Sequence, residues 1–84
     1  MGDEDEVTTG VRELLAQVLD VPSASIGPDF SAASAPSWTS LNHLMLISQV
    51  ESAFGVFFTS EEIRGLTSFD GIVKAVVEHR SSHR

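Results

Sequence analysis

The chain has 84 residues, with twelve acidic and five basic side chains and a formal net charge of −7. A chain of this length forms one domain and buries about 60% of the surface that its unfolded form exposes, too little for most self-contained active sites. The absence of cysteine excludes disulfides and thiolate metal sites, and the negative charge argues against nucleic acid as a partner because it would repel a phosphate backbone.

The negative charge is concentrated at the amino-terminal end, in the run Asp3-Glu4-Asp5-Glu6. Without these four acids the formal charge of −7 falls to −3. We interpret residues 1–6 as a solvated leader of a single domain, whose carboxylates also favour the positive end of the first helix dipole. No apolar run approaches the ~20 residues that span a bilayer and no signal segment is present, so we expect a cytoplasmic protein without membrane insertion.

Apolar residues recur at helical spacing in the first part of the chain, at Val7, Val11, Leu14, Leu15 and Val18. This spacing predicts an amphipathic helix over about 5–19. Gly10 lies inside it and costs about 1 kcal/mol relative to alanine, so we expect the first turn to fray.

A long loop is predicted between Asp20 and Ser40, because all three prolines fall there and no helical period survives. Val21, Ile26 and Phe30 are the apolar residues expected to pin this loop to the bundle. The segment 31–37 has no such residue, and we expect it to be the most mobile part of the chain before Ser40.

A second helix is predicted over about 40–54, and its apolar side chains fall on two arcs. The first arc should face the core and contains Leu46, Ile47, Val50 and Phe54. The second arc lies close to Ser40 and contains Leu41, Leu44 and Met45. It is either an exposed patch that binds a partner or a surface that packs under the long loop.

Two further helices follow. Thr59 and Glu62 have the spacing of a capping box, which predicts a short helix over about 60–64 that stops near Gly65. The last helix should begin at Thr67 or Ser68, and it should bury Phe69, Ile72, Val73 and Val76. Residues 80–84 read as a polar tail, and we interpret His79 and His83 as solvated rather than as metal ligands. No strand is predicted, so the fold class is an all-α bundle of three main helices plus one short helix.

Ser40 lies where the irregular segment gives way to the second helix. A hydroxyl there can cap the helix, or it can carry a phosphate ester beside the free N–H groups of the first turn. A nucleophile-and-base pair with His43 is not supported, because no G-x-S-x-G turn accompanies it. We expect His43 to be partly buried and hydrogen-bonded near the helix start. The alternative is that His43 lines the mouth of a pocket that a flexible arm tethered to Ser40 would enter.

The run from Ser37 to Phe69 resembles the acyl carrier proteins, and the resemblance extends over about 7–77. In that family a D-S-L tripeptide opens the second helix, and its serine carries a 4′-phosphopantetheine arm. Here the tripeptide reads Thr39-Ser40-Leu41. The helix continues with the family's L-x-x-L-x-L-I-x-x-L-E-x-x-F-G progression, as Leu44, Leu46-Ile47, Val50-Glu51 and Phe54-Gly55. One departure is Thr39, which replaces the family's aspartate and puts the efficiency of modification in question.

The resemblance implies a non-catalytic carrier, expected to be monomeric, with covalent 4′-phosphopantetheine on Ser40. The implied partners are a phosphopantetheinyl transferase and enzymes that load, transfer or condense acyl groups. The residues assigned to the partner surface are Trp38, Leu41, Leu44, Met45, Glu51, Glu61 and Glu62. The pattern Trp38-x-Ser40-Leu41-x-His43-Leu44 looks like the small carriers of polyketide or related specialised, including antibiotic, pathways.

The sequence also bears on the cargo and on two alternatives. We expect four phenylalanines to fill the core and to leave room only for short or polar cargo, namely Phe54, Phe57, Phe58 and Phe69. An aminoacyl or peptidyl carrier has the same fold, but it usually has Gly-Gly-His before the serine, which Trp38-Thr39 does not match. A helical protein-interaction module, in which Ser40 only caps the helix, is the alternative from another class.

Overall fold

The computed structural model describes residues 2–82, with side chains described for residues 5–80. Its elements are α1 (Gly2–Leu19), the 3-10 turns η1 (Ser23–Ser25) and η2 (Ala32–Ser34), α2 (Ser40–Phe54), α3 (Ser60–Gly65) and α4 (Phe69–Ser82). The described residues form no strand, only one isolated bridge between Ser31 and Ser68. The predicted all-α bundle with three main helices and one short helix is confirmed.

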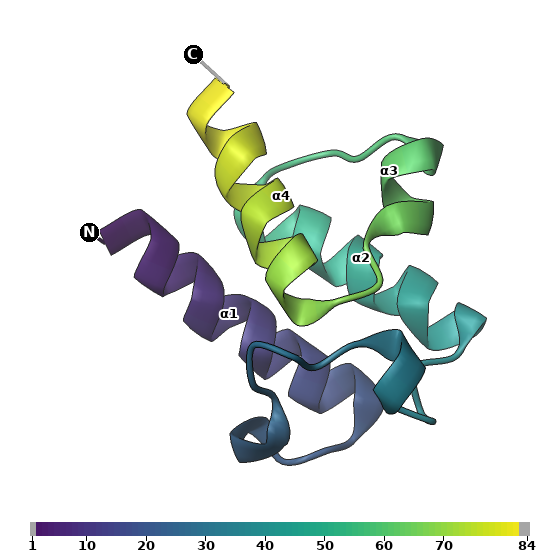
Figure 1. Ribbon diagram of the computed structural model, residues 1–84. Coiled ribbons are helices and arrows are strands. Elements are labelled where there is room, and N and C mark those ends of the chain that lie inside the picture. Colours follow the sequence, from purple (N-terminus) through teal and green to yellow (C-terminus); the bar gives the residue numbers. More distant parts are fainter. Residues whose placement is uncertain (1, 83–84) are drawn as a thin grey trace.

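The three long helices form the bundle, and α1 packs against both α2 and α4 (Figure 1). The loop between α1 and α2 wraps around the carboxyl-terminal half of α1, while α3 lies in the connection from α2 to α4. Among the described residues no helix is both long and apolar enough to cross a membrane.

The predicted bounds of α2 are confirmed, whereas both ends of the chain differ from the prediction. Helix α1 begins at Gly2, so the residues interpreted as an acidic leader belong largely to its first turns. Helix α4 begins at Phe69 and continues to Ser82, so the predicted polar tail is helical up to that residue. His79 and Arg80 in the last turn of α4 complement the helix dipole, which favours the continuation of this helix.

The core is made by one face of each long helix. Helix α1 contributes four residues that are at most 3% exposed, Val7, Val11, Leu15 and Leu19. Leu46, Ile47 and Val50 of α2 and Phe69, Ile72, Val73 and Val76 of α4 are buried against them, as predicted, while Phe54 is only half-buried. Phe57 is 80% exposed, so the prediction that it fills the core is wrong.

The segment 31–37 is anchored, contrary to the prediction. The backbone N–H of Ala32 donates to the carbonyl of Thr67 at 2.8 Å, and that of Phe69 donates to Phe30 at 3.0 Å. Ala35 and Trp38 are buried in the core. Backbone pairing with a segment more than thirty residues later in the chain therefore holds the loop where its side-chain composition indicated no anchor.

Gly10 allows α1 and α2 to approach closely. A Cβ atom added at this position would lie 2.7 Å from Cζ of Phe54, closer than atoms of this kind can pack. The sequence suggested only a helix-weakening glycine, but the structure shows that it makes room for an aromatic ring.

We predict that Gly10→Ala stabilises the fold only when Phe54 is shortened. Alanine normally gains about 1 kcal/mol over glycine inside a helix. In the natural chain, displacement of the Phe54 ring should offset this gain, whereas in a Phe54→Leu background the gain should appear in full. Urea unfolding of the four proteins as a double-mutant cycle measures the difference, which we expect to reach about 1 kcal/mol. Equal effects of Gly10→Ala in both backgrounds would contradict the close approach.

Candidate functional site around Ser40

Ser40 is the first residue of α2 and its side chain is exposed. Thr39 is the N-cap, because it has extended backbone angles (φ −84°, ψ 172°) and its Oγ1 accepts a hydrogen bond from the N–H of Asn42 at 3.2 Å. The interpretation of Ser40 as the cap is therefore wrong. The Ser40 hydroxyl makes no hydrogen bond with the described residues, so it is accessible for covalent modification.

A shallow groove of about 390 Å³ lies beside Ser40, between the start of α2, the end of α3 and the segments that flank them. It is lined by Ala32, Trp38, Thr39, Ser40, His43, Leu44, Ile63, Arg64 and Thr67. Most of this lining is apolar. Arg64 is the one charged side chain in the lining, and no carboxylate borders the groove.

His43 lines the groove and is hydrogen-bonded through both ring nitrogens. The indole Nε1–H of Trp38 donates to Nδ1 of His43 at 3.0 Å, and Nε2 of His43 lies 2.7 Å from the carbonyl oxygen of Ile63. An indole nitrogen can only donate, so Nδ1 must accept and the proton of a neutral imidazole resides on Nε2, which donates to Ile63. The prediction of a partly buried, satisfied histidine is confirmed, and neither nitrogen is available to Ser40 as a base.

Trp38 is predicted to belong to the partner surface, but the structure places it in the core. Its side chain is only 7% exposed and stacks on Phe30 with ring centroids 6.0 Å apart. Trp38 thus lines the groove rather than forming part of a protruding surface.

Leu41, Leu44 and Met45 remain exposed, with 68%, 59% and 45% of their surface open to solvent. They do not pack under the long loop, so that interpretation of the arc is wrong, and the binding of a partner by this exposed patch stays a prediction. We call these three residues the α2 patch. Leu44 also borders the groove, which makes the patch continuous with the surroundings of Ser40.

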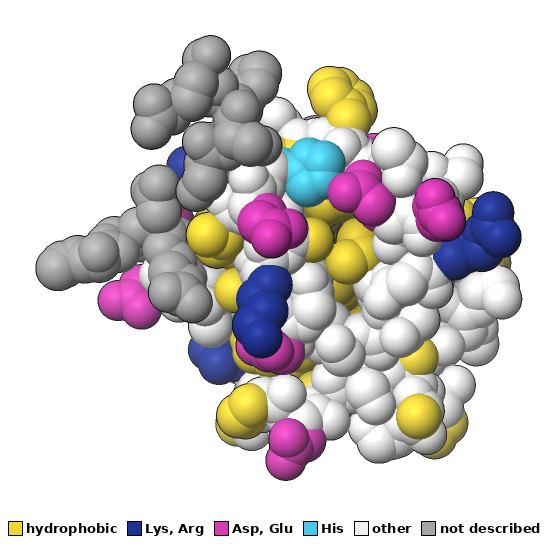
Figure 2. All heavy atoms as spheres, turned by 45° about the horizontal axis from the view of Figure 1, so that its top comes forward, with side chains coloured by type: hydrophobic (Ala, Val, Ile, Leu, Met, Phe, Trp, Pro, Cys, Tyr) yellow, Lys and Arg dark blue, Asp and Glu magenta, His cyan; other side chains and the backbone are white. Residues whose placement is uncertain are grey.

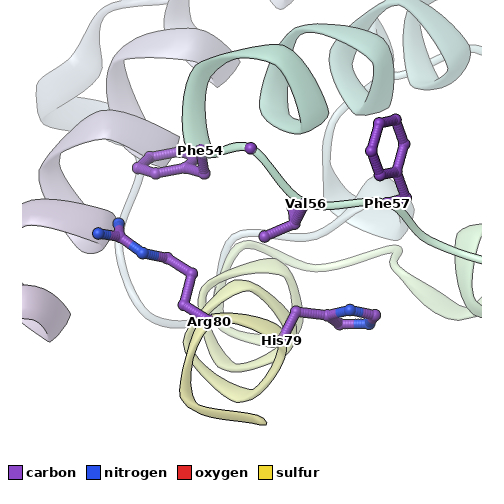
Figure 3. A pocket seen from close by; sticks show the side chains of 6 residues that line it. Phe54, Val56, Phe57, His79 and Arg80 are labelled. Atoms are coloured by element: carbon purple, nitrogen blue, oxygen red, sulfur yellow. The ribbon is translucent and has the colours of Figure 1, made fainter. Parts of the chain in front are cut away.

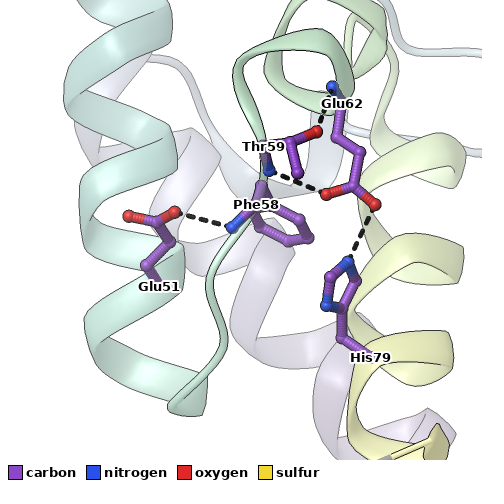
Figure 4. A network of polar contacts seen from close by, with 5 residues as sticks. All are labelled: Glu51, Phe58, Thr59, Glu62 and His79. Atoms are coloured by element: carbon purple, nitrogen blue, oxygen red, sulfur yellow. Dashed lines mark hydrogen bonds and ion pairs between the residues drawn. The ribbon is translucent and has the colours of Figure 1, made fainter.

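Two of the three acids assigned to the partner surface have structural roles. Glu51 accepts a hydrogen bond from the N–H of Phe58 at 2.9 Å, and Glu62 accepts from the N–H of Thr59 at 2.8 Å (Figure 4). Glu61 is exposed. On the face shown in Figure 2 the acidic side chains are scattered rather than gathered into one patch.

The predicted capping box of α3 is confirmed, and His79 extends it. The other oxygen of Glu62 lies 3.0 Å from Nε2 of His79, which also packs edge-on against Phe58 (Figure 4). The interpretation of His79 as a solvated residue is therefore wrong, while His83 lies outside the described residues. The Thr59 N–H first, and His79 second, lower the pKa of the Glu62 carboxyl.

A second hollow of about 450 Å³ lies at the opposite end of α2. Phe54, Gly55, Val56, Phe57, His79 and Arg80 line it (Figure 3). It is remote from Ser40 along α2 and brings none of the predicted site residues together. No three His, Cys, Asp or Glu side chains in the described part of the chain are grouped so as to hold a metal ion.

We predict that Glu62 makes the stability of the fold depend on pH in the acidic range. Because the pKa of Glu62 is lower in the folded state, its contribution to stability is present above the usual glutamate value of about 4.3 and is lost as the pH falls through the folded-state value. Free energies of unfolding from urea titrations should differ between the natural chain and Glu62→Gln at about pH 6, and the difference should shrink towards about pH 3.

Glu61→Gln is the matched control for this experiment, because Glu61 is the exposed neighbour of Glu62 on the same short helix. Its stability should follow that of the natural chain across the range. A difference between the natural chain and Glu62→Gln that does not change with pH would contradict the assigned role of the carboxylate.

Comparison with known proteins adds to this geometry. No family model matches the chain. The chain is 30% identical over 80 residues to a protein of Rubrobacter xylanophilus named acyl carrier protein, and the match covers 95% of this chain and 99% of that protein. The similarity thus extends through every element of the fold, including the start of α2.

Proposed function

The chain belongs to the acyl carrier protein family, and on that premise we propose that Ser40 carries a 4′-phosphopantetheine arm on which acyl groups are held as thioesters and presented to pathway enzymes. The observation that carries this proposal is the exposed Ser40 hydroxyl, which opens α2 without a hydrogen-bond partner in the described structure and borders a groove. In this role the protein has no catalytic activity of its own.

Attachment of the arm fits the chemistry of the site. Oγ of Ser40 would bond to the pantetheine-side phosphorus of coenzyme A, the bond of that phosphorus to the bridging pyrophosphate oxygen would break, and the nucleotide would leave. The hydroxyl proton would pass to the transferase or to water, because both nitrogens of His43 are engaged elsewhere. The phosphate on Ser40 would then lie beside the first-turn N–H groups of α2, where an anion is favoured.

The pathway is proposed from the sequence pattern. The residues Trp38, Ser40, Leu41, His43 and Leu44 look like those of carriers from polyketide or related specialised pathways. The groove beside Ser40 has a volume of only about 390 Å³, and the hydrogen-bonded Trp38 and His43 occupy part of its lining. We therefore propose short or polar acyl groups as cargo.

The α2 patch is the proposed docking surface for the transferase and for the acyl-transfer or condensing enzymes. Between Ser40 and Phe54 the one charged residue is Glu51, and its carboxylate already accepts a backbone hydrogen bond. Exposed ion pairs contribute only about 0–1 kcal/mol and weaken in salt. Apolar contacts with Leu41, Leu44 and Met45 should therefore supply most of the affinity.

We predict that Ser40 is the one residue that gains the arm. After exposure to a phosphopantetheinyl transferase and coenzyme A, the intact mass of the natural chain should rise by the mass of the arm, while Ser40→Ala should stay unmodified. A mass gain by Ser40→Ala would refute the assignment, and no gain by the natural chain with several transferases would refute the carrier role.

We further predict that Thr39→Asp is loaded faster than the natural chain, because it restores the carboxylate that is usual beside the serine. Thr39→Asn is the matched control, since asparagine and aspartate both cap a helix and differ here in charge. Initial rates of loading should rank Asp above Asn. Equal rates for these two variants would show that the carboxylate is dispensable in this protein.

For docking, we predict that Leu44→Ala or Met45→Ala weakens binding to a cognate enzyme by about 2 kcal/mol, the usual cost of truncating an interface anchor. Glu61→Gln should change the affinity much less, because Glu61 is an exposed rim charge. Titration calorimetry at low and high salt measures the affinity of each variant and its salt dependence. As a control, the free energy of unfolding of Leu44→Ala should equal that of the natural chain, because Leu44 is exposed. A steep salt dependence together with normal binding by the Leu44 and Met45 variants would contradict an apolar docking surface.

A further inference from the structure

We propose that His43 is a positioning residue for Ser40, and that it acts only in its neutral form. In that form it holds the indole of Trp38 on one side of the groove and the backbone of α3 on the other. Protonation of His43 should break its hydrogen bond with Trp38. The side of the groove formed by Trp38 would then loosen, and the presentation of Ser40 to the transferase would be impaired. The last step rests on the proposed function, whereas the structural change does not.

The hydrogen-bond geometry selects one protonation state. Nδ1 of His43 faces the indole N–H of Trp38 at 3.0 Å, and Nε2 lies 2.7 Å from the carbonyl oxygen of Ile63. The neutral imidazole with its proton on Nε2 satisfies both partners. The imidazolium carries a hydrogen on each nitrogen, so its Nδ1–H would point at the Trp38 N–H and that bond would break.

Among the residues that line the groove with His43, none is an acid that would compensate its charge. Arg64 of α3 is the one charged residue that lines the groove with His43, and it has the same sign. Glu62, next to Ile63, is bound to Thr59 and His79, and Glu51, two turns further along α2, is bound to Phe58. Leu44, Ala32 and Thr67, which line the rest of the groove, carry no charge.

The two partners of His43 belong to the segments that border Ser40. Trp38 lies two residues before Ser40, and its backbone N–H donates to Ala35 at 2.9 Å, so a shift of the indole would be transmitted to the turn that leads into α2. None of the residues of α3 is fully buried, although Ile63 packs partly buried against the core. The hydrogen bond between the carbonyl of Ile63 and His43 connects α3 to α2. His43 therefore connects both sides of the groove to the helix that carries Ser40.

The first test follows the indole N–H signal of Trp38 by NMR between about pH 8 and pH 5, the range in which histidines change charge. The chain contains one tryptophan, so the signal needs no assignment. We expect the signal of the natural chain to move and to exchange faster with water as the pH falls. His43→Gln is the matched variant, because an amide can accept from Trp38 and donate to Ile63 but does not titrate, and its indole signal should stay constant.

Two further variants complete this test. His43→Leu removes both bonds, so its indole signal should resemble that of the acidic natural chain at every pH. His79→Gln controls for the other described histidine, which is bound to Glu62 on α3, and its indole signal should titrate like that of the natural chain. An indole signal that is independent of pH in the natural chain, or one that titrates equally in His43→Gln, would overturn the proposal.

The second test measures loading of Ser40 at each pH as the ratio of kcat/KM for the natural chain to that for His43→Gln, which cancels the pH dependence of the transferase. We expect a ratio near one at about pH 8 that falls by about fivefold towards about pH 5, the equivalent of one hydrogen bond. A constant ratio would refute the positioning role. Absence of loading in both proteins at every pH would instead refute the proposed function, while the indole titration would still decide the structural part.

Discussion

The main constraint on this fold is that a small bundle can cover only one face of α2. Helix α1 runs along the bundle and buries Val7, Val11, Leu15 and Leu19 against α2 and α4. Because the chain has no cysteine, neither a disulfide nor a thiolate metal site can stabilise it. This apolar contact must therefore supply most of the free energy of folding. The opposite arc of α2 has no helix to pack against. Leu41, Leu44 and Met45 are therefore left exposed by the architecture itself, next to the serine that opens the helix.

Helix α3 is held differently from the other helices. It has no fully buried residue. His43 donates a hydrogen bond to the carbonyl of Ile63, and His79 donates one to the carboxylate of Glu62, so these two contacts connect α3 to α2 and α4. The groove beside Ser40 is thus bordered by α2, which apolar contacts hold in the bundle, and by α3, whose Ile63 carbonyl is hydrogen-bonded to His43.

The sequence predicted those features that depend on local patterns. The bounds of α2 follow from its apolar period, and the capping box of Thr59 and Glu62 follows from spacing alone. The resemblance to carriers placed Ser40 at the start of α2 through its tripeptide, as the structure has it, while its modification stays a prediction. These features need only neighbours within a few residues, or a motif that can be compared directly.

The features that the sequence did not predict depend on contacts between distant segments. The pairing of Ala32 with Thr67 anchors a loop that looks unanchored, and Glu62 binds a histidine seventeen residues away. The proximity of Trp38 to Ser40 in the sequence suggested a surface position, but the direction of its side chain is set by Phe30 and His43. The exposure of Phe57 could not be read from its apolar character, because α2 ends at Phe54 and its C-cap Gly55 adopts a left-handed conformation that reorients the following residues.

The use of acids for internal contacts bears on how such a carrier can be recognised. Glu51 and Glu62 are the acids that a basic partner surface would otherwise meet, yet each accepts a backbone hydrogen bond, and Glu62 also binds His79. Pairing either one with a partner would compete with a contact that holds the segment between α2 and α3. Thr39 removes a further carboxylate at the position beside Ser40. Glu51 and Glu62 are thus engaged in internal contacts, whereas the side chains exposed on α2 near Ser40 are the apolar Leu41, Leu44 and Met45. The buried Trp38 and the half-buried His43 line the groove beside them.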